Sequence, residues 1–86
     1  MIGELNTYRS EVSPDLFVTI PTAEAEATLA MVDGLRRMRL KIVRQRYRPA
    51  ARGADADFLA RVSTQILACG YALHGFERAA HGDGNA

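Results

Sequence analysis

Apolar residues recur at steps of three and four along most of this chain, and this pattern predicts two long helices. The first is expected to begin at Thr22 and to run to about Tyr47, because Pro49 disfavours helical geometry in the residue before it. The second is expected from about Asp55 to Ala80. The seams that define the two helices are Met31, Leu35, Met38 and Ile42 in the first, and Leu59, Val62, Ile66, Cys69, Leu73, Phe76 and Ala80 in the second. These are heptad spacings, so two helices of about 25 residues joined by a short loop predict an antiparallel hairpin with coiled-coil packing.

The N-terminal segment 1–21 follows a different pattern. Residues 16–20 are β-branched or apolar and lie between two prolines. Leu16, Val18 and Ile20 alternate with Phe17 and Thr19, which is typical of a short strand. A single strand cannot satisfy its own backbone groups, so it must pair with another chain, join a partner's sheet or lie over the helices. We therefore expect an all-α fold, with an extended segment at 1–21, an antiparallel two-helix hairpin at 22–80 and a disordered tail at 81–86.

Each predicted helix carries apolar surface beyond its seam. In the first helix Leu40, Val43 and Tyr47 share a flank with Leu29 and Val32, and in the second Ala68, Ala72, Gly75 and Ala79 recur at steps of four, three and four. A line of small residues allows another backbone to approach closely, although alanine is also a common helix former. Because a two-helix hairpin rarely stabilises itself, we expect these surfaces to bind a partner protein or a second copy, as a homodimer or heterodimer.

Positive charge is concentrated in one part of the chain. Eight of the eleven basic residues lie between Arg36 and Arg52, a stretch without Asp or Glu, although the net charge is only +1. On the predicted first helix, Arg37, Lys41, Arg44 and Arg48 form one basic face. Three interpretations stay open: a solvated face, a surface for an acidic protein, or phosphate contacts with nucleic acid. The chain has no helix-turn-helix spacing, zinc pattern or RNA-binding aromatic motif.

Residue types that support catalysis are sparse. The histidines are His74 and His81, the one cysteine is Cys69, and no acidic cluster accompanies them at a metal-site spacing. Asp55 and Asp57 suit helix capping better than acid–base chemistry, and Cys69 is expected to be a small buried group. We therefore expect no catalytic residues, no metal, no cofactor and no enzymatic activity. The single cysteine and the lack of a long apolar run predict a soluble, cytoplasmic protein without a membrane partner.

Two families resemble this chain. From Thr28 to Phe76 the predicted hairpin resembles the small two-helix co-chaperones of type III secretion needle proteins, in its basic first-helix end, its loop at 52–56 and the pattern Ala72-Leu73-x-x-Phe76. That resemblance implies pairing with a second small helical protein, which together with the hairpin holds the needle subunit soluble.

A proline before a long first helix and a long second helix resemble the TraM-type antiactivators of quorum sensing, on Ile20-Pro21-Thr22 and Leu35-Arg36-Arg37. This second resemblance implies dimerisation through the second helix. Both families imply a small bacterial regulator or chaperone that binds another protein. We therefore expect a non-enzymatic protein–protein interaction module that works through helical faces. The alternative is a nucleic-acid-binding transcriptional regulator that uses the basic face.

Overall fold

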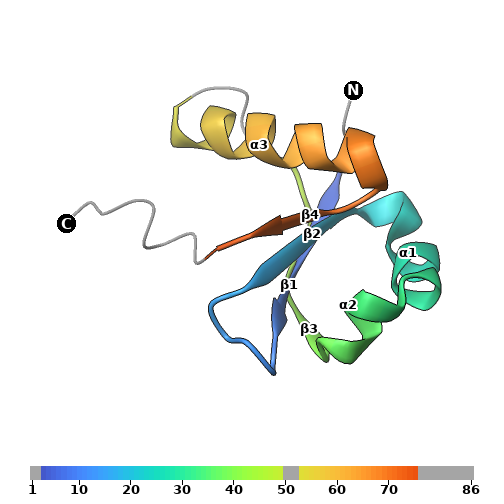
Figure 1. Cartoon of the computed structure of the whole chain (residues 1–86). Coiled ribbons are helices and arrows are strands. Elements are labelled where there is room, and N and C mark those ends of the chain that lie inside the picture. The colour runs from blue at the N-terminus through green and yellow to red at the C-terminus, as the bar shows by residue number, and fades with distance from the viewer. Residues whose placement is uncertain (1–2, 50–52, 76–86) are drawn as a thin grey trace.

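The computed structural model, which describes residues 3–49 and 53–75, shows an α/β fold built on a four-stranded antiparallel sheet. The predicted all-α hairpin is therefore wrong, and so is the predicted coiled-coil pairing of two helices. The elements are β1 Leu5–Ser10, β2 Phe17–Pro21, the short 3-10 helix η1 Thr22–Glu24, α1 Ala25–Met31, α2 Asp33–Arg37, β3 Leu40–Tyr47, α3 Ala54–Cys69 and β4 Ala72–His74. The strand order is β3-β1-β2-β4, so β3 and β4 form the two edges of the sheet (Figure 1).

The first two strands form a hairpin in which Thr7 lies opposite Thr19 and Tyr8 lies opposite Val18. β2 lies where the sequence predicted a strand at 16–20, and its partners are β1 and β4 of the same chain. Ser10 organises the turn between them. Its Oγ accepts the backbone N–H groups of Val12 and Ser13, at 3.1 and 2.9 Å.

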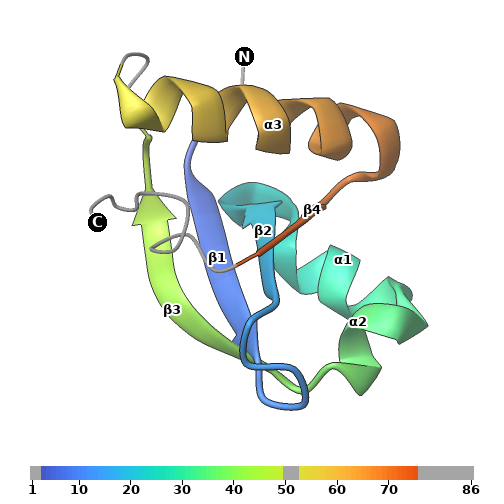
Figure 2. The same cartoon turned by 60° about the vertical axis from the view of Figure 1, so that its left-hand side comes forward.

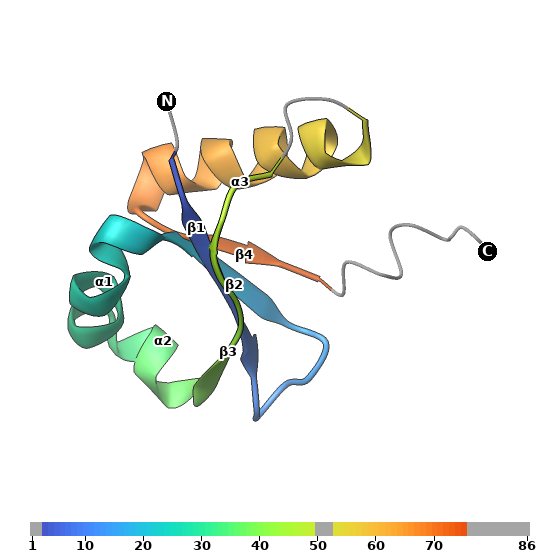
Figure 3. The ribbon, with the colours of Figure 1, turned by 180° about the vertical axis from the view of Figure 1, so that it is seen from behind.

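The sheet is covered by helices on both faces (Figures 2 and 3). On one face, Tyr8, Val18 and Ile20 form a core cluster with Ala25 and Leu35 of the α1–α2 segment. On the other face, α3 crosses the sheet at the end where β1 begins and β3 ends. There its fully buried Val62 packs against Leu5 of β1 and Ala72 of β4. Leu5 and Tyr8 of β1 thus enter two different cores, because successive side chains of a strand point to opposite faces.

The predicted first helix is replaced by two short helices and a strand. Arg39 adopts a positive φ of 55°, which takes the chain out of helical geometry, and Leu40–Tyr47 then pairs with β1. This strand contains the β-branched pair Ile42 and Val43, which favours a sheet. Met31, expected in the helical seam, has 81% of its surface exposed. The apolar spacing of this segment therefore predicted a buried helical seam that the structure does not contain.

The predicted second helix ends early at Gly70. This residue has a φ of 95° and donates its N–H to the carbonyl of Ile66 at 2.7 Å, which is a left-handed helix C-cap. The predicted seam residues Leu59, Val62 and Ile66 do pack toward the sheet. Cys69, predicted to be buried, is exposed. Phe76, Ala80 and the tail predicted at 81–86 lie outside the described residues.

Candidate functional site

β3 is the strand that the fold covers least. All six residues between its ends are exposed, and Ile42 and Val43 expose 41% and 47% of their surfaces. β1 and β2 are by contrast almost entirely buried. Since β3 pairs only with β1 in the described part of the chain, its second edge carries backbone groups without a partner strand.

Ile42 shows which backbone groups are available at this edge. Ser10 donates its N–H to the carbonyl of Leu16, so alternate residues of β1, including Tyr8, direct their backbone groups toward β2. Ile42 lies opposite Tyr8, and the two form a pair without mutual hydrogen bonds. The N–H and C=O of Ile42 therefore point away from the sheet, and within residues 3–49 and 53–75 they have no hydrogen-bond partner.

The other edge of the sheet is closed by a side chain. Gln65 of α3 accepts the Leu73 N–H through Oε1 at 2.9 Å and donates Nε2–H to the Leu73 carbonyl at 3.0 Å. These two bonds reproduce what a neighbouring strand would provide. Within the described residues, the sheet thus has one closed edge at β4 and one open edge at β3.

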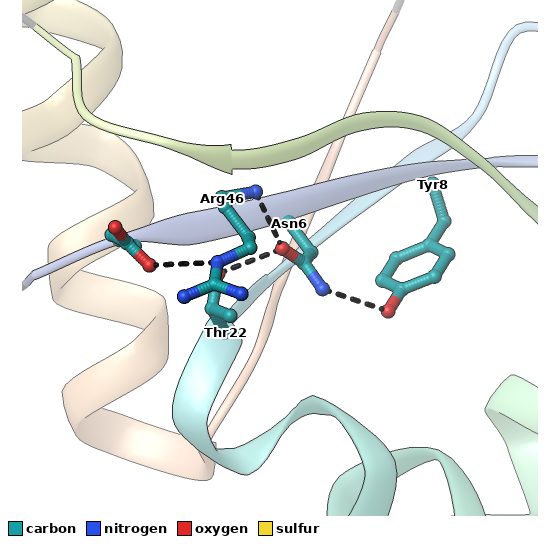
Figure 4. Close-up of polar contacts among 5 residues, drawn as sticks. Asn6, Tyr8, Thr22 and Arg46 are labelled. Carbon is teal, nitrogen blue, oxygen red and sulfur yellow. Dashed lines mark hydrogen bonds and ion pairs between the residues drawn. The ribbon is translucent and has the colours of Figure 1, made fainter.

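A buried asparagine shapes the far half of β3 (Figure 4). The β1–β3 register is interrupted at two places, and Arg46 adopts a positive φ of 54°. Asn6, only 6% exposed, accepts the Arg46 backbone N–H at 2.9 Å and the Thr22 hydroxyl at 2.7 Å on the same Oδ1. Its Nδ2 group donates to the Tyr8 hydroxyl at 3.3 Å. This irregular segment leaves Leu40–Ile42 as the part of the edge with regular register.

Basic side chains lie on β3 and on the elements next to it in the chain or in the sheet. Arg36 forms an ion pair with Asp33 at 3.6 Å, and Arg46 forms one with Glu4 at 3.4 Å. The guanidinium of Arg44 lies over the Tyr47 ring at 4.0 Å from its centroid. The exposed cations that form no ion pair with any described residue are Arg9, Arg37, Arg39, Lys41, Arg44 and Arg48.

The four residues of the predicted basic face lie on different elements. Arg37 belongs to α2, Lys41 and Arg44 belong to β3, and Arg48 follows that strand. Lys41 lies opposite Arg9, and Arg44 lies opposite Thr7, so both project from the sheet face on which α3 packs. The predicted helical face does not exist, but two of its members share a face of β3. Arg9 was not in the predicted set, because only strand pairing brings it beside Lys41.

The predicted partner-binding residues are also divided. Leu40, Val43 and Tyr47 belong to β3, whereas Ala68 is exposed on α3 and Gly75 is exposed after β4. Ala72 is completely buried in the core, and Ala79 lies outside the described residues. The line of small residues expected on one helix is therefore absent from α3. The three β3 residues lie on an edge strand, where Val43 is exposed while Leu40 and Tyr47 are partly buried and pack against the two core clusters.

A hydrogen-bonded chain of side chains crosses all four strands on the α3 face. The Tyr47 hydroxyl bonds to Thr7 Oγ1 at 2.6 Å, Thr7 Oγ1 to Thr19 Oγ1 at 2.8 Å, and Thr19 Oγ1 to His74 Nε2 at 2.6 Å. The His74 ring stacks on Phe17 and meets the edge of Phe58. Thr19 is fully buried, so no substrate reaches its hydroxyl. This network joins the four strands of the sheet.

The described residues contain no group of three or more His, Cys, Asp or Glu side chains placed to hold a metal ion. Within the same residues, none of the helices has the length and apolar character needed to cross a membrane. Comparison of the chain with protein-family models, curated proteins and solved structures finds no match.

Proposed function

We propose that this protein is a small, non-enzymatic, cytoplasmic interaction module that binds a protein partner through the open edge of β3. The observation that carries the proposal is the contrast between the two edges. Gln65 satisfies the outward backbone groups of Leu73 at β4, whereas those of Ile42 at β3 are left for a partner. Exposed edge strands are otherwise protected in soluble proteins, since they pair readily with other chains.

Strand addition fits the composition of this edge. Backbone hydrogen bonds supply affinity in such complexes, and the alternate side chains of the strand supply specificity. Ile42 and Val43 offer exposed apolar surface directly beside the available backbone groups. The free thiol of Cys69 supports the cytoplasmic part of the proposal, because exposed thiols persist in reducing compartments.

Nucleic-acid binding is the second candidate, because several cations near β3 form no ion pair with any described residue and phosphate contacts need little more. Single-stranded nucleic acids also use exposed aromatic rings as stacking platforms. Among the described residues no aromatic side chain is exposed, and the Tyr47 ring lies under Arg44. Phosphate binding also leaves the exposed Ile42 and Val43 without a role. Protein binding accounts for more of the edge.

Site-specific photo-cross-linking tests the proposal. A photoreactive phenylalanine analogue replaces Val43 on β3 and, as matched controls, Val12 in the β1–β2 turn or Leu67 on α3. The control side chains are more exposed than Val43, at 60% and 84% against 47%. We expect a discrete protein adduct in cells from position 43 and none from positions 12 and 67. Absence of an adduct at position 43, or the same adducts at all three positions, contradicts the proposal.

A further inference from the structure

We infer that the segment received by β3 is an acidic, extended peptide of the partner in which carboxylates alternate with apolar residues. This inference rests on the proposed function and specifies the chemistry of the occupant. It follows from three properties of the edge: the charge of its side chains, the face from which each side chain projects, and the length of its regular part.

The charge of β3 disfavours a second copy of this chain as the occupant. If two β3 strands paired antiparallel, Lys41 and Arg44 of one copy would approach those of the other. Like charges on facing strands are destabilising, whereas opposite charges on facing strands attract. Neither residue has a carboxylate partner among the described residues that would reduce this repulsion. An acidic segment turns the same charges into an attraction.

The two faces of β3 specify different side chains in the incoming strand. Lys41 and Arg44 project from the α3 face together with Arg9, which lies opposite Lys41. Ile42 projects from the other face, where Tyr8 belongs to the apolar core. Because side chains of adjacent strands share faces, the incoming strand should place carboxylates on the α3 face and apolar residues on the other. An alternating acidic and apolar sequence meets both requirements.

The irregular half of β3 restricts where the peptide pairs. The β1–β3 register is unbroken from Leu40 to Ile42 and is interrupted beyond Tyr8 and Thr7 of β1. A bulged strand presents backbone groups at irregular spacing, which a regular partner strand cannot follow. The peptide should therefore pair along the end of β3 nearest α2, with its carboxylates close to Lys41.

A matched set of synthetic peptides tests the inference on the full-length, ¹⁵N-labelled protein. The probe has 8 strand residues, the length of β3, in which Glu alternates with Val and Ile, and its ends are blocked. One control replaces every Glu with Lys. A second control keeps the acidic sequence but is N-methylated at alternate residues, which removes the N–H groups along one edge. A single-stranded oligothymidylate and the protein alone are measured in parallel.

We expect the acidic peptide to shift the amide resonances of Leu40 and Ile42 and to bind about tenfold or more tightly than the lysine peptide. N-methylation should abolish binding. In the double variant Lys41→Glu with Arg44→Glu the preference should reverse, so that the lysine peptide binds more tightly. Both substituted side chains are exposed, so the variant should keep the fold. A reversed preference also excludes a loss of binding caused by unfolding.

Other outcomes separate the inference from the proposed function. Equal binding of the acidic and lysine peptides, both abolished by N-methylation, overturns the acidic occupant and supports the open edge. Acidic binding that tolerates N-methylation overturns strand pairing. If no peptide binds, the inference fails. The proposed function then survives only if cross-linking at position 43 is specific. Light scattering of the protein alone shows whether the occupant of the edge is a second copy of this chain. Oligothymidylate binding without peptide binding overturns the inference in favour of nucleic acid.

Discussion

Asn6 shows how one buried side chain controls the form of an exposed edge. Its Oδ1 atom accepts hydrogen bonds from the Arg46 backbone and from the Thr22 hydroxyl, so it connects β1 to both β3 and the start of η1. Without it, the backbone N–H of Arg46 would have no acceptor in an interruption of the sheet ladder. A buried donor without an acceptor costs free energy, which gives this residue a role beyond packing.

We expect Asn6→Ala to lower the free energy of unfolding by about 1–3 kcal/mol, because it removes the acceptor for two donors at a largely buried position. The measurement is urea unfolding followed by circular dichroism. The control is Gln45→Ala, an exposed residue within the same irregular segment of β3, which should change the free energy of unfolding by less than about 0.5 kcal/mol. If both variants unfold alike, the Asn6 network does not stabilise the bulge.

The hydroxyl network under α3 leads to a second prediction. Thr19→Val preserves the shape of a fully buried side chain but removes the oxygen that bonds to Thr7 and His74. We expect unfolding to become easier by about 1–3 kcal/mol, since His74 Nε2 and the Thr7 hydroxyl each lose a partner. Thr64→Val on the exposed side of α3 serves as the matched control. A stability equal to that of the control would show that the network contributes little to the sheet.

At the scale of elements, the two edges of the sheet differ in length and in how their outward backbone groups are hydrogen-bonded. β4 has only three residues and is closed by the amide of Gln65, whereas β3 has eight residues and is open. Short edge strands and covering side chains are common protections against unwanted pairing. This contrast between the two edges is the observation on which the proposed binding at β3 rests.

We expect Gln65→Ala to open the β4 edge. The variant loses both hydrogen bonds to Leu73, which are worth about 0.5–1.5 kcal/mol each. Protection of the Leu73 amide against hydrogen exchange should therefore fall by about tenfold. Alanine is at least as good a helix former as glutamine, so α3 itself should remain intact. Thr64→Ala is the control on the neighbouring helix position. Unchanged exchange at Leu73 would mean that Gln65 does not close this edge.

The secondary structure was only partly predictable, for reasons that lie in particular residues. The strand at 16–20 was predictable because alternation between two prolines favours few other structures. The segment 40–47 was ambiguous, since its apolar residues fit helical spacing while Ile42 and Val43 favour a strand. Residues 40–47 form a strand because they pair with β1, and local sequence patterns do not predict that pairing. Gly70 was a readable helix-end signal, but the apolar spacing continued past it and predicted a longer helix.

At the scale of the molecule, the clustering of cations along the chain was predictable, and their arrangement in space was not. The run of cations from Arg36 to Arg52 predicted a positive surface, and the described part of that run lies in α2, in β3 and in the residues beside them. Its geometry depends on the strand order, because β1 brings Arg9 beside Lys41 and the chain bend at Arg39 separates Arg37 from the strand. Spacing along one helix could not have revealed either relation.

The same charges should keep this molecule from pairing with itself. We expect Lys41→Thr with Arg44→Thr to cause concentration-dependent self-association, because it removes like-charge repulsion from an open edge and adds a residue type that favours strands. Sedimentation velocity measures the change. Arg37→Thr with Arg48→Thr alters the net charge equally but lies outside β3, and should leave the assembly state unchanged.

Adding Ile42→Pro to the Lys41→Thr, Arg44→Thr variant identifies the surface responsible. Proline removes a backbone N–H that points away from β1, a position where edge strands tolerate it. Self-association should therefore disappear while the circular dichroism spectrum stays the same. If association persists with proline at position 42, it occurs through another surface. If the charge-deleted variant never associates, repulsion between cations is not what keeps the open edge of β3 unpaired, and the argument against a second copy as its occupant loses its basis.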